Sequence, residues 1–167
     1  MTALSTNRLL LRPLTLDDAE AAFEWTSDDR VTKYMSYSSH NDINVTLEWL
    51  KNIKTSDTAF EFGIVRRSDN MLIGSCGIAL HDDGFWAFGY NLRFDCWGMG
   101  YATEAVQAMM NNVRQNFKDA RFMAECVVEN TASARVIEKC GLVFKEYSEF
   151  RSFDGKKLFK TKIFESR

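Results

Sequence analysis

The sequence is nearly free of proline and contains no long run of apolar residues. Pro13 is the only proline among 167 residues, and no Pro/Gly-rich linker, low-complexity tract or internal repeat divides the chain. This unbroken length predicts a single domain over residues 1–167. The N-terminal residues are too polar for a signal peptide, and no stretch is long enough for a membrane helix. We therefore expect a cytoplasmic protein with no membrane partner.

Histidine and closely spaced cysteine are also scarce, and both absences bear on metal binding. The two histidines, His40 and His81, are far apart, and no pair of cysteines has the CxxC spacing of a zinc site. The cysteines are Cys76, Cys96, Cys126 and Cys140. We predict no metal site, and we interpret the cysteines as small core residues of a protein in a reducing compartment.

The chain also lacks an excess of positive charge. It has 21 Lys and Arg residues against 23 Asp and Glu residues, which gives a formal net charge of -2. No stripe of basic residues is present that could follow a phosphate backbone. A nucleic-acid partner is therefore not expected.

Hydrophobic periodicity and turn residues predict seven strands and four helices. The strands are expected at residues 8–14, 60–67, 71–80, 84–94, 121–128, 142–150 and 157–164, and the helices at 16–26, 42–54, 102–117 and 131–140. Short turns join the second, third and fourth strands, so these strands should be antiparallel neighbours. The order predicts an α/β or α+β domain with a mixed, largely antiparallel sheet.

The stretch CWGMGYATEA places small residues where a strand passes into a long helix. Gly98, Gly100 and Ala102 would leave the first backbone N–H groups of the helix uncovered, as an anion site requires. No GK[ST] follows, so the stretch is not a P-loop, and GxGxxG is absent, so it is not a dinucleotide fingerprint. A phosphate cradle and a plain tight turn both remain open at this point. Glu104, one turn into the helix, is expected to complement the helix dipole and to bond locally.

A second strand-to-helix junction follows at ENTASARVIEKCGL. Asn130 and Ser133 stand at the opening of the next helix, where they could simply cap it. Two consecutive junctions that open at the same edge of a sheet would, however, form the walls of one cleft. One wall would offer bare N–H groups, and the other a side-chain amide and a hydroxyl.

These motifs resemble the GNAT N-acetyltransferases, in particular the branch of the ribosomal-protein N-terminal acetyltransferases. The resemblance lies in GYNLRFDCWGMGYATEAVQAMM, in ENTASARVIEKCGL about thirty residues later, and in the opening LSTNRLLLRPLTLDDAEAAFEW. It covers residues 5–165 in the expected order. Two departures are Leu142 in place of the usual phenylalanine and Phe88 in place of an acidic residue that many relatives carry.

The resemblance implies a seven-stranded GNAT-type sheet with about four helices, splayed between its fourth and fifth strands, with acetyl-CoA as co-substrate in the opening. The backbone at Leu92 and Phe94 would pair with the pantetheine arm as an added strand does. Asn130 would bond the same arm, and Ser133 would lie near the sulfur. The pyrophosphate would be held by backbone N–H groups of Trp97, Gly98, Met99, Gly100, Tyr101, Ala102 and Thr103.

The implied reaction is direct acetyl transfer from the thioester to an amine. The backbone N–H of Leu92 would stabilise the oxyanion, and Ser133 would supply or relay a proton to the sulfur. Because Phe88 replaces the usual acid, the base is open. Glu125 is the base candidate on the fifth strand, and Glu61, His81 and a water relay are the others.

The acceptor follows from the resemblance alone, which favours the α-amine of a protein N terminus. A small amine or an aminoglycoside-like molecule remains open, as does a CoA-binding regulatory module without turnover. Relatives are often dimers, so a homodimer is expected. The aromatic residues of segment 25–43, Trp25, Tyr34 and Tyr37, could line an acceptor groove, with Asp28 or Asp29 attracting a cationic amine.

Overall fold

The protein is described by a computed structural model that covers residues 2–167. One eight-stranded sheet runs through it in the order β1-β2-β3-β4-β5-β6-β8-β7. The strands are β1 (Leu4–Ser5), β2 (Leu9–Arg12), β3 (Ala59–Arg66), β4 (Met71–Leu80), β5 (Phe85–Leu92), β6 (Arg121–Val127), β7 (Leu142–Arg151) and β8 (Leu158–Ser166). Every neighbouring pair is antiparallel except β5 and β6. The predicted mixed, largely antiparallel sheet is thereby confirmed.

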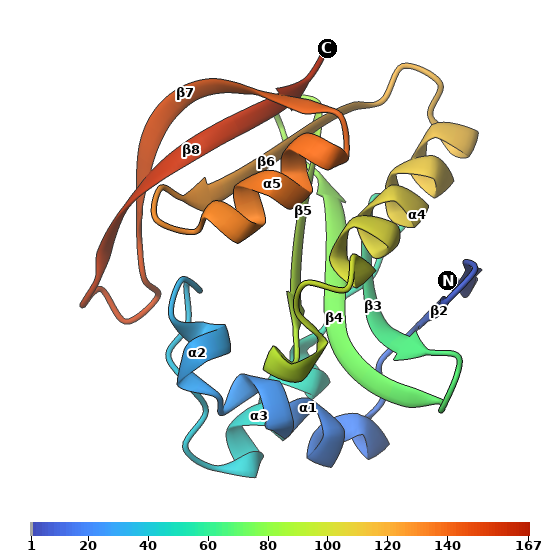
Figure 1. The fold of residues 1–167 in the computed structure, drawn as a ribbon, viewed down its shortest axis with the longest axis vertical. Coiled ribbons are helices and arrows are strands. Elements are labelled where there is room, and N and C mark those ends of the chain that lie inside the picture. Colours follow the sequence, from blue (N-terminus) through green and yellow to red (C-terminus); the bar gives the residue numbers. More distant parts are fainter. Residues whose placement is uncertain (1) are drawn as a thin grey trace.

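Helices cover the sheet on two sides. The helices are α1 (Ala19–Thr26), α2 (Asp29–Thr32), α3 (Ile43–Asn52), α4 (Tyr101–Asn116) and α5 (Thr131–Lys139), with short 3-10 turns at Leu16–Asp18 and Phe94–Cys96. In Figure 1, α4 and α5 flank β5 in the upper half, and α1 to α3 gather at the bottom beside the lower ends of β4 and β5. The tip of the β7–β8 hairpin comes down toward α2 (Figure 1).

Two hydrophobic clusters hold these layers together. The larger joins β2 to β6 and β8 with α4 and α5, and it includes the completely buried Ala105, Val106 and Met109 of α4. The apolar stripe of α4 thus packs on the sheet as its helical spacing indicates. The smaller cluster lies on the other face, where Trp25 of α1 is fully buried against Val65 and Leu72. Trp25 is therefore a core residue and does not line a groove.

The sheet opens between β5 and β6. These strands pair in parallel only from Phe85 to Ala87, opposite Arg121 to Met123. Beyond Ala87 the two strands diverge, and β6 continues with β8 and β7 as a separate wing (Figure 1). The predicted splay between the fourth and fifth expected strands is confirmed, because those strands correspond to β5 and β6.

The element count differs from the prediction by one strand and one helix. The added strand is β1, which pairs Leu4 with Leu11 and Ser5 with Leu10 of β2. Two residues are too few to show an alternating pattern. The added helix is α2, a single turn capped by the Asp28 side chain, which accepts from the backbone N–H of Arg30. A single turn carries no amphipathic period, so neither element was visible in the sequence.

Within residues 2–167, no helix has the length and apolar character needed to cross a bilayer. Over the same residues, no three His, Cys, Asp or Glu side chains gather in a metal-binding arrangement.

Candidate active site

The edge of β5 at the opening carries backbone groups without a neighbouring strand. The backbone N–H of His81 donates to the carbonyl of Phe85 at 2.8 Å, and that of Arg93 donates to the carbonyl of Ile73 at 2.8 Å. Because backbone groups alternate sides along a strand, the odd-numbered residues of β5 face β4. The N–H and C=O groups of its even-numbered residues beyond Ala87 therefore face the opening. These residues are Phe88, Tyr90 and Leu92.

The glycine-rich loop before α4 forms a concavity of free N–H groups. Gly98 and Gly100 have φ values of 74° and 80°, a left-handed conformation that glycine adopts without strain. Across residues 2–167, the backbone N–H groups from Gly98 to Thr103 find no acceptor, and Gly100 caps α4 without a side-chain bond. A Cβ at Gly98 would have no heavy atom within 4 Å, so the loop faces open space there. Free donors at a helix N-terminus suit a phosphate.

Glu104 ties the glycine-rich loop to the N-terminal segment of the chain. The expectation that Glu104 bonds locally is therefore wrong. Its carboxylate accepts from Thr6 Oγ1 at 2.6 Å, from the backbone N–H of Arg8 at 2.9 Å and from Arg8 Nε at 2.7 Å. The Arg8 guanidinium also donates to the Met99 carbonyl at 2.9 Å and lies over the Tyr101 ring. Burial alone would raise the pKa of Glu104, but the bonds from Thr6 and Arg8 outweigh it and lower the pKa. The bond partners lie almost one hundred residues earlier in the chain, so helix periodicity could not reveal them.

Replacing Glu104 by alanine should therefore destabilise the protein. We expect the free energy of unfolding at pH 7 to fall by about 1–3 kcal/mol, since several charge-assisted bonds are lost together. Because the folded-state pKa of Glu104 is lowered, its contribution is present above the unfolded carboxyl pKa and is lost as pH falls below it. Urea unfolding of both proteins at pH 7 and at pH 3.5 tests this. Equal losses at the two pH values would contradict it.

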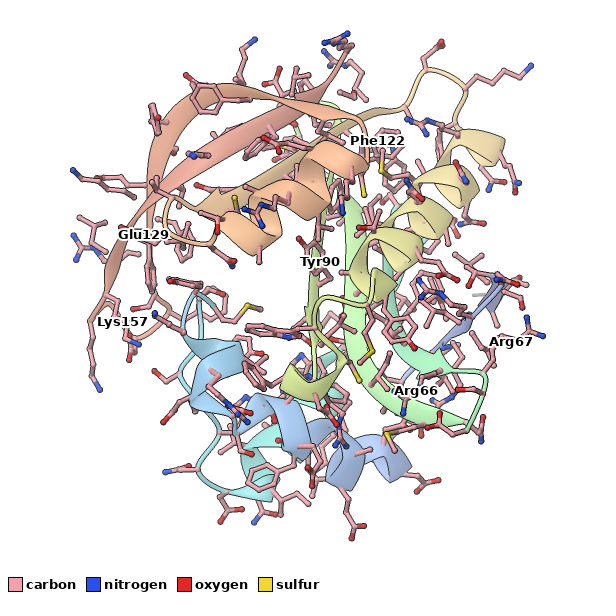
Figure 2. The ribbon with its side chains drawn as sticks, in the orientation of Figure 1. Arg66, Arg67, Tyr90, Phe122, Glu129 and Lys157 are labelled. Atoms are coloured by element: carbon pink, nitrogen blue, oxygen red, sulfur yellow. The ribbon has the colours of Figure 1, made fainter. Side chains whose placement is uncertain are left out.

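Tyr90 and Ser133 meet across the opening, and the sequence reasoning missed this contact. The Tyr90 hydroxyl lies 2.9 Å from Ser133 Oγ and donates to the Ser133 carbonyl at 3.2 Å. Tyr90 extends from β5 toward α5 (Figure 2). Burial is the largest cause that raises the pKa of the Tyr90 phenol well above its usual range. The phenol is therefore protonated at neutral pH and can donate. Asn130 caps α5, since its Oδ1 accepts from the backbone N–H of Ser133 at 3.1 Å.

Two aromatic side chains stand at the entrance of the loop. Trp97 is 43% exposed and its indole N–H donates to the Leu92 carbonyl at 2.9 Å, which ties the loop to the end of β5. Phe94 is 42% exposed, contacts the Trp97 ring and lies beneath the Arg30 guanidinium at 3.9 Å. Phe94 begins a 3-10 turn, so its backbone is not extended as that of Leu92 is.

The candidate bases occupy very different places. Phe88 is 8% exposed and belongs to the core with α4, so position 88 points away from solvent. Glu125 is exposed and accepts a short hydrogen bond from Thr161 of β8. His81 is exposed beside Phe85, at the end of β5 that is still paired with β6. Glu61 of β3 is partly buried, and burial raises the pKa of its carboxyl to about 7.

The two acidic residues proposed to attract an amine are already engaged. Asp28 forms an ion pair with Arg30 at 2.6 Å, and Asp29 accepts from Ser39. The segment that follows α2 is joined to the β7–β8 hairpin, because the backbone N–H of Phe153 donates to the Ser36 carbonyl at 2.7 Å. This hydrogen bond joins the β7–β8 hairpin to the helical segment on the α1–α3 face of the sheet.

An open sheet edge beside a loop of free N–H groups is the arrangement of a protein that takes an extended, phosphate-bearing ligand. Residues 8–143 match the family model of the acetyltransferase (GNAT) domain. The chain therefore belongs to the GNAT acetyltransferase family. The predicted family is confirmed, and with it an acetyl-CoA-dependent N-acetyltransferase with acetyl-CoA as co-substrate.

Relatives and solved structures agree with this assignment. An uncharacterized N-acetyltransferase, p20 of Bacillus licheniformis, is 30% identical over 162 residues, which cover 94% of this chain and 90% of that protein. A GNAT-family acetyltransferase of Bacillus anthracis is similar in structure, with a TM-score of 0.86 at 25% identity over 98% of this chain and 97% of that one. RimL, a ribosomal L7/L12 α-N-protein acetyltransferase solved with coenzyme A, has a TM-score of 0.80 at 16% identity over 98% and 97%. At that identity, RimL shows the shared fold alone.

Proposed function

We propose that this enzyme transfers the acetyl group of acetyl-CoA directly to the α-amine of a protein N terminus, within a ternary complex. The observation that carries the transfer is the opening itself, where the free N–H groups of β5 lie beside the Tyr90–Ser133 pair. The choice of acceptor is supported by the likeness in fold to RimL, which acts on such an amine. An α-amine has a pKa near 8, well below the pKa of lysine, so a larger share is uncharged and nucleophilic at neutral pH.

The cofactor-binding residues follow from the bare backbone. The pyrophosphate is assigned to the N–H groups of the loop and of the first turn of α4, where the dipole adds to the attraction. The residues of this cradle are Gly98, Met99, Gly100, Tyr101, Ala102 and Thr103. The backbone N–H of Trp97, which the sequence also predicted here, instead donates to the Phe94 carbonyl at 3.2 Å. The pantetheine arm would pair with the free edge of β5 through Leu92, while Phe94 at the 3-10 turn would border the arm. The Nδ2 group of Asn130 faces no acceptor among residues 2–167 and would bond the arm.

Two groups would serve the chemistry on the cofactor side. The backbone N–H of Leu92 faces the opening and would stabilise the oxyanion without reorganisation. Ser133 would donate a proton to the departing sulfur, and Tyr90 would hold the Ser133 hydroxyl in place. Tyr90 is thus a positioning residue. Glu125 lies across the gap on β6, but its bond to Thr161 makes it the less suited base.

The test is thiol release from acetyl-CoA with matched acceptors. One peptide carries a free α-amine and no lysine, a second has the same sequence with a blocked α-amine and one lysine, and spermidine and an aminoglycoside represent small amines. We expect release with the first peptide and at least ~100-fold less with the second, because acetyl transfer requires an oriented amine. Faster turnover of spermidine or the aminoglycoside would contradict the acceptor and favour the small-amine alternative. Tight binding of CoA with no release in any arm would favour the regulatory module.

A further inference from the structure

Three residues stand in register across β3, β4 and β5 on the face that α1 to α3 occupy. Glu61 pairs with Gly77, and Gly77 pairs with Gly89. Residues opposite one another in a sheet project to the same face, and neighbouring strands are ~4.8 Å apart. Two consecutive positions between Glu61 and the opening therefore carry no side chain.

The Glu61 side chain lies over Gly77, the first of these two positions without a side chain. A Cβ built on Gly77 would lie 2.1 Å from Glu61 Oε2 and 3.1 Å from its Cδ, so the carboxylate reaches across β4. A Cβ on Gly89 would meet no heavy atom within 4 Å, which leaves free space between the carboxylate and the edge of β5. Gly89 is exposed, so this space is open to solvent.

The carboxylate lies in a partly buried site without a partner. Within residues 2–167, the Glu61 carboxylate has neither a hydrogen bond nor an ion pair. The titratable groups that feel its charge are Tyr37, from the segment before α3, and Cys76 of β4. Burial followed by the charge of Glu61 raises the pKa of Tyr37 to about 12, and the same two causes raise the pKa of the Cys76 thiol. Both groups are therefore neutral near pH 7, and neither one compensates the Glu61 charge. An unpaired, desolvated carboxylate is costly to folding, and such groups gather at functional sites.

We propose that Glu61 is the general base of the acetyl transfer, and that Gly77 and Gly89 clear its path to the acceptor amine. This inference rests on the proposed acetyl transfer. Glu61 lies on the α1–α3 face, whereas Ser133 lies on α5 with the larger cluster, so base and acid approach the gap from opposite faces of the sheet.

The proton balance is complete with these two groups. Glu61 takes one proton from the acceptor ammonium, and the freed lone pair forms the N–C bond to the acetyl carbonyl carbon. The C–S bond then breaks, its electron pair leaves on the sulfur, and the sulfur takes up the second nitrogen proton through Ser133. Glu61 afterwards releases its proton to water, so each turnover yields one acetylated amine, one thiol and one proton.

Glu61→Gln should lower kcat at pH 8 by at least ~100-fold, in the range for loss of a general base, while the Kd of acetyl-CoA stays within ~3-fold of wild type. Wild-type kcat should level off above about pH 7, where Glu61 is deprotonated, whereas kcat of Glu61→Gln should keep rising with the free-amine share of the acceptor, whose pKa is near 8. Glu48→Gln, at an exposed position on α3, removes the same charge and should retain the wild-type rate. Gly77→Ala should displace the carboxylate and reproduce the loss with Glu61 present.

Thermal melting separates catalysis from misfolding. The folded-state pKa of Glu61 is raised, so the folded protein binds more protons than the unfolded chain and wild type loses stability as pH rises from about 4.5 to about 7. Glu61→Gln lacks this loss and should melt no lower than wild type at pH 8. An unchanged rate in Glu61→Gln, the same pH profile of kcat in both proteins, or a loss in Glu125→Gln alone would overturn the assignment.

The outcomes for Glu61 and for the acceptor can be told apart. If wild type acetylates a small amine but no peptide, the proposed acceptor fails and Glu61 is tested with that amine. If wild type acetylates the peptide and Glu61→Gln does so equally well, the base assignment alone fails. If wild type releases no thiol with any of the amines tested, the proposed acceptor and the proposed base both fail.

Discussion

Gly98→Asp is expected to raise the Kd for acetyl-CoA by ~100-fold or more. A carboxylate would project from the loop into the space that a pyrophosphate would fill, since nothing lies within 4 Å of a Cβ there. Two like charges ~4 Å apart near a protein surface repel by about 4 kcal/mol before screening, which exceeds the roughly 2.7 kcal/mol that a hundredfold change requires. Aspartate tolerates a positive φ better than most residues, so the fold should survive the change. Titration calorimetry with acetyl-CoA measures the effect.

The matched control is Gly155→Asp. Gly155 has a φ of 72°, and it also has no heavy atom within 4 Å of a built Cβ. It lies in the β7–β8 turn, on the opposite side of the molecule from α4 (Figure 1). It therefore reproduces the backbone strain and the added charge without approaching the loop. We expect acetyl-CoA to bind this variant within ~3-fold of wild type. Equal losses in the two variants would contradict the cradle, because the effect would then be general.

Ser133→Ala is expected to lower kcat by about 100-fold while leaving the Kd of acetyl-CoA within a few-fold of wild type. The departing thiolate would lose its proton donor, and a positioned general acid contributes on the order of 100-fold or more. Ser133 lies inside α5, and alanine is a good helix residue, so the helix should remain intact. Stopped-flow or coupled thiol assays at saturating acetyl-CoA measure kcat. Wild-type turnover in Ser133→Ala would remove Ser133 from the mechanism.

Tyr90→Phe distinguishes positioning from direct proton donation. If Tyr90 only orients Ser133 through the 2.9 Å contact, its loss should cost about 10-fold in kcat, and the double variant should be no slower than Ser133→Ala. Additive losses in the double variant would instead show that Tyr90 acts on its own. Binding of acetyl-CoA to Tyr90→Phe should stay near the wild-type value, since the phenol bonds only Ser133 among residues 2–167.

Short-range patterns were sufficient for most of the fold. The apolar stripe of α4 and the alternation of apolar residues in β3 to β5 are patterns within a single element. The structure has a helix and three strands at the places where these patterns predict them. The two elements that were missed, β1 and α2, are held by pairing and capping and not by a hydrophobic period. The glycine loop was also visible, because small residues where a strand passes into a helix leave the first N–H groups of the helix uncovered.

Contacts between distant segments could not be read in the same way. Glu104 looked like a helix-dipole residue, and its real partners, Thr6 and Arg8, belong to the other end of the chain. Glu61 was one base candidate among several, and its partly buried position over Gly77 depends on the register of β3 against β4. A shift of one residue would turn Glu61 to the opposite face, so no local pattern could have selected it.

The sequence by itself determined the local chemistry of this protein: a bare N–H loop before a long helix, a capped helix that carries Ser133, and the family to which both motifs belong. Only the tertiary structure decided which groups face one another. The early divergence of β5 from β6 exposes the Leu92 backbone, and strand register places Glu61 on the face opposite Ser133. The physical reason is that hydrogen-bond pairing between strands depends on residues far apart in the chain, whereas helix caps and glycine turns depend on neighbours.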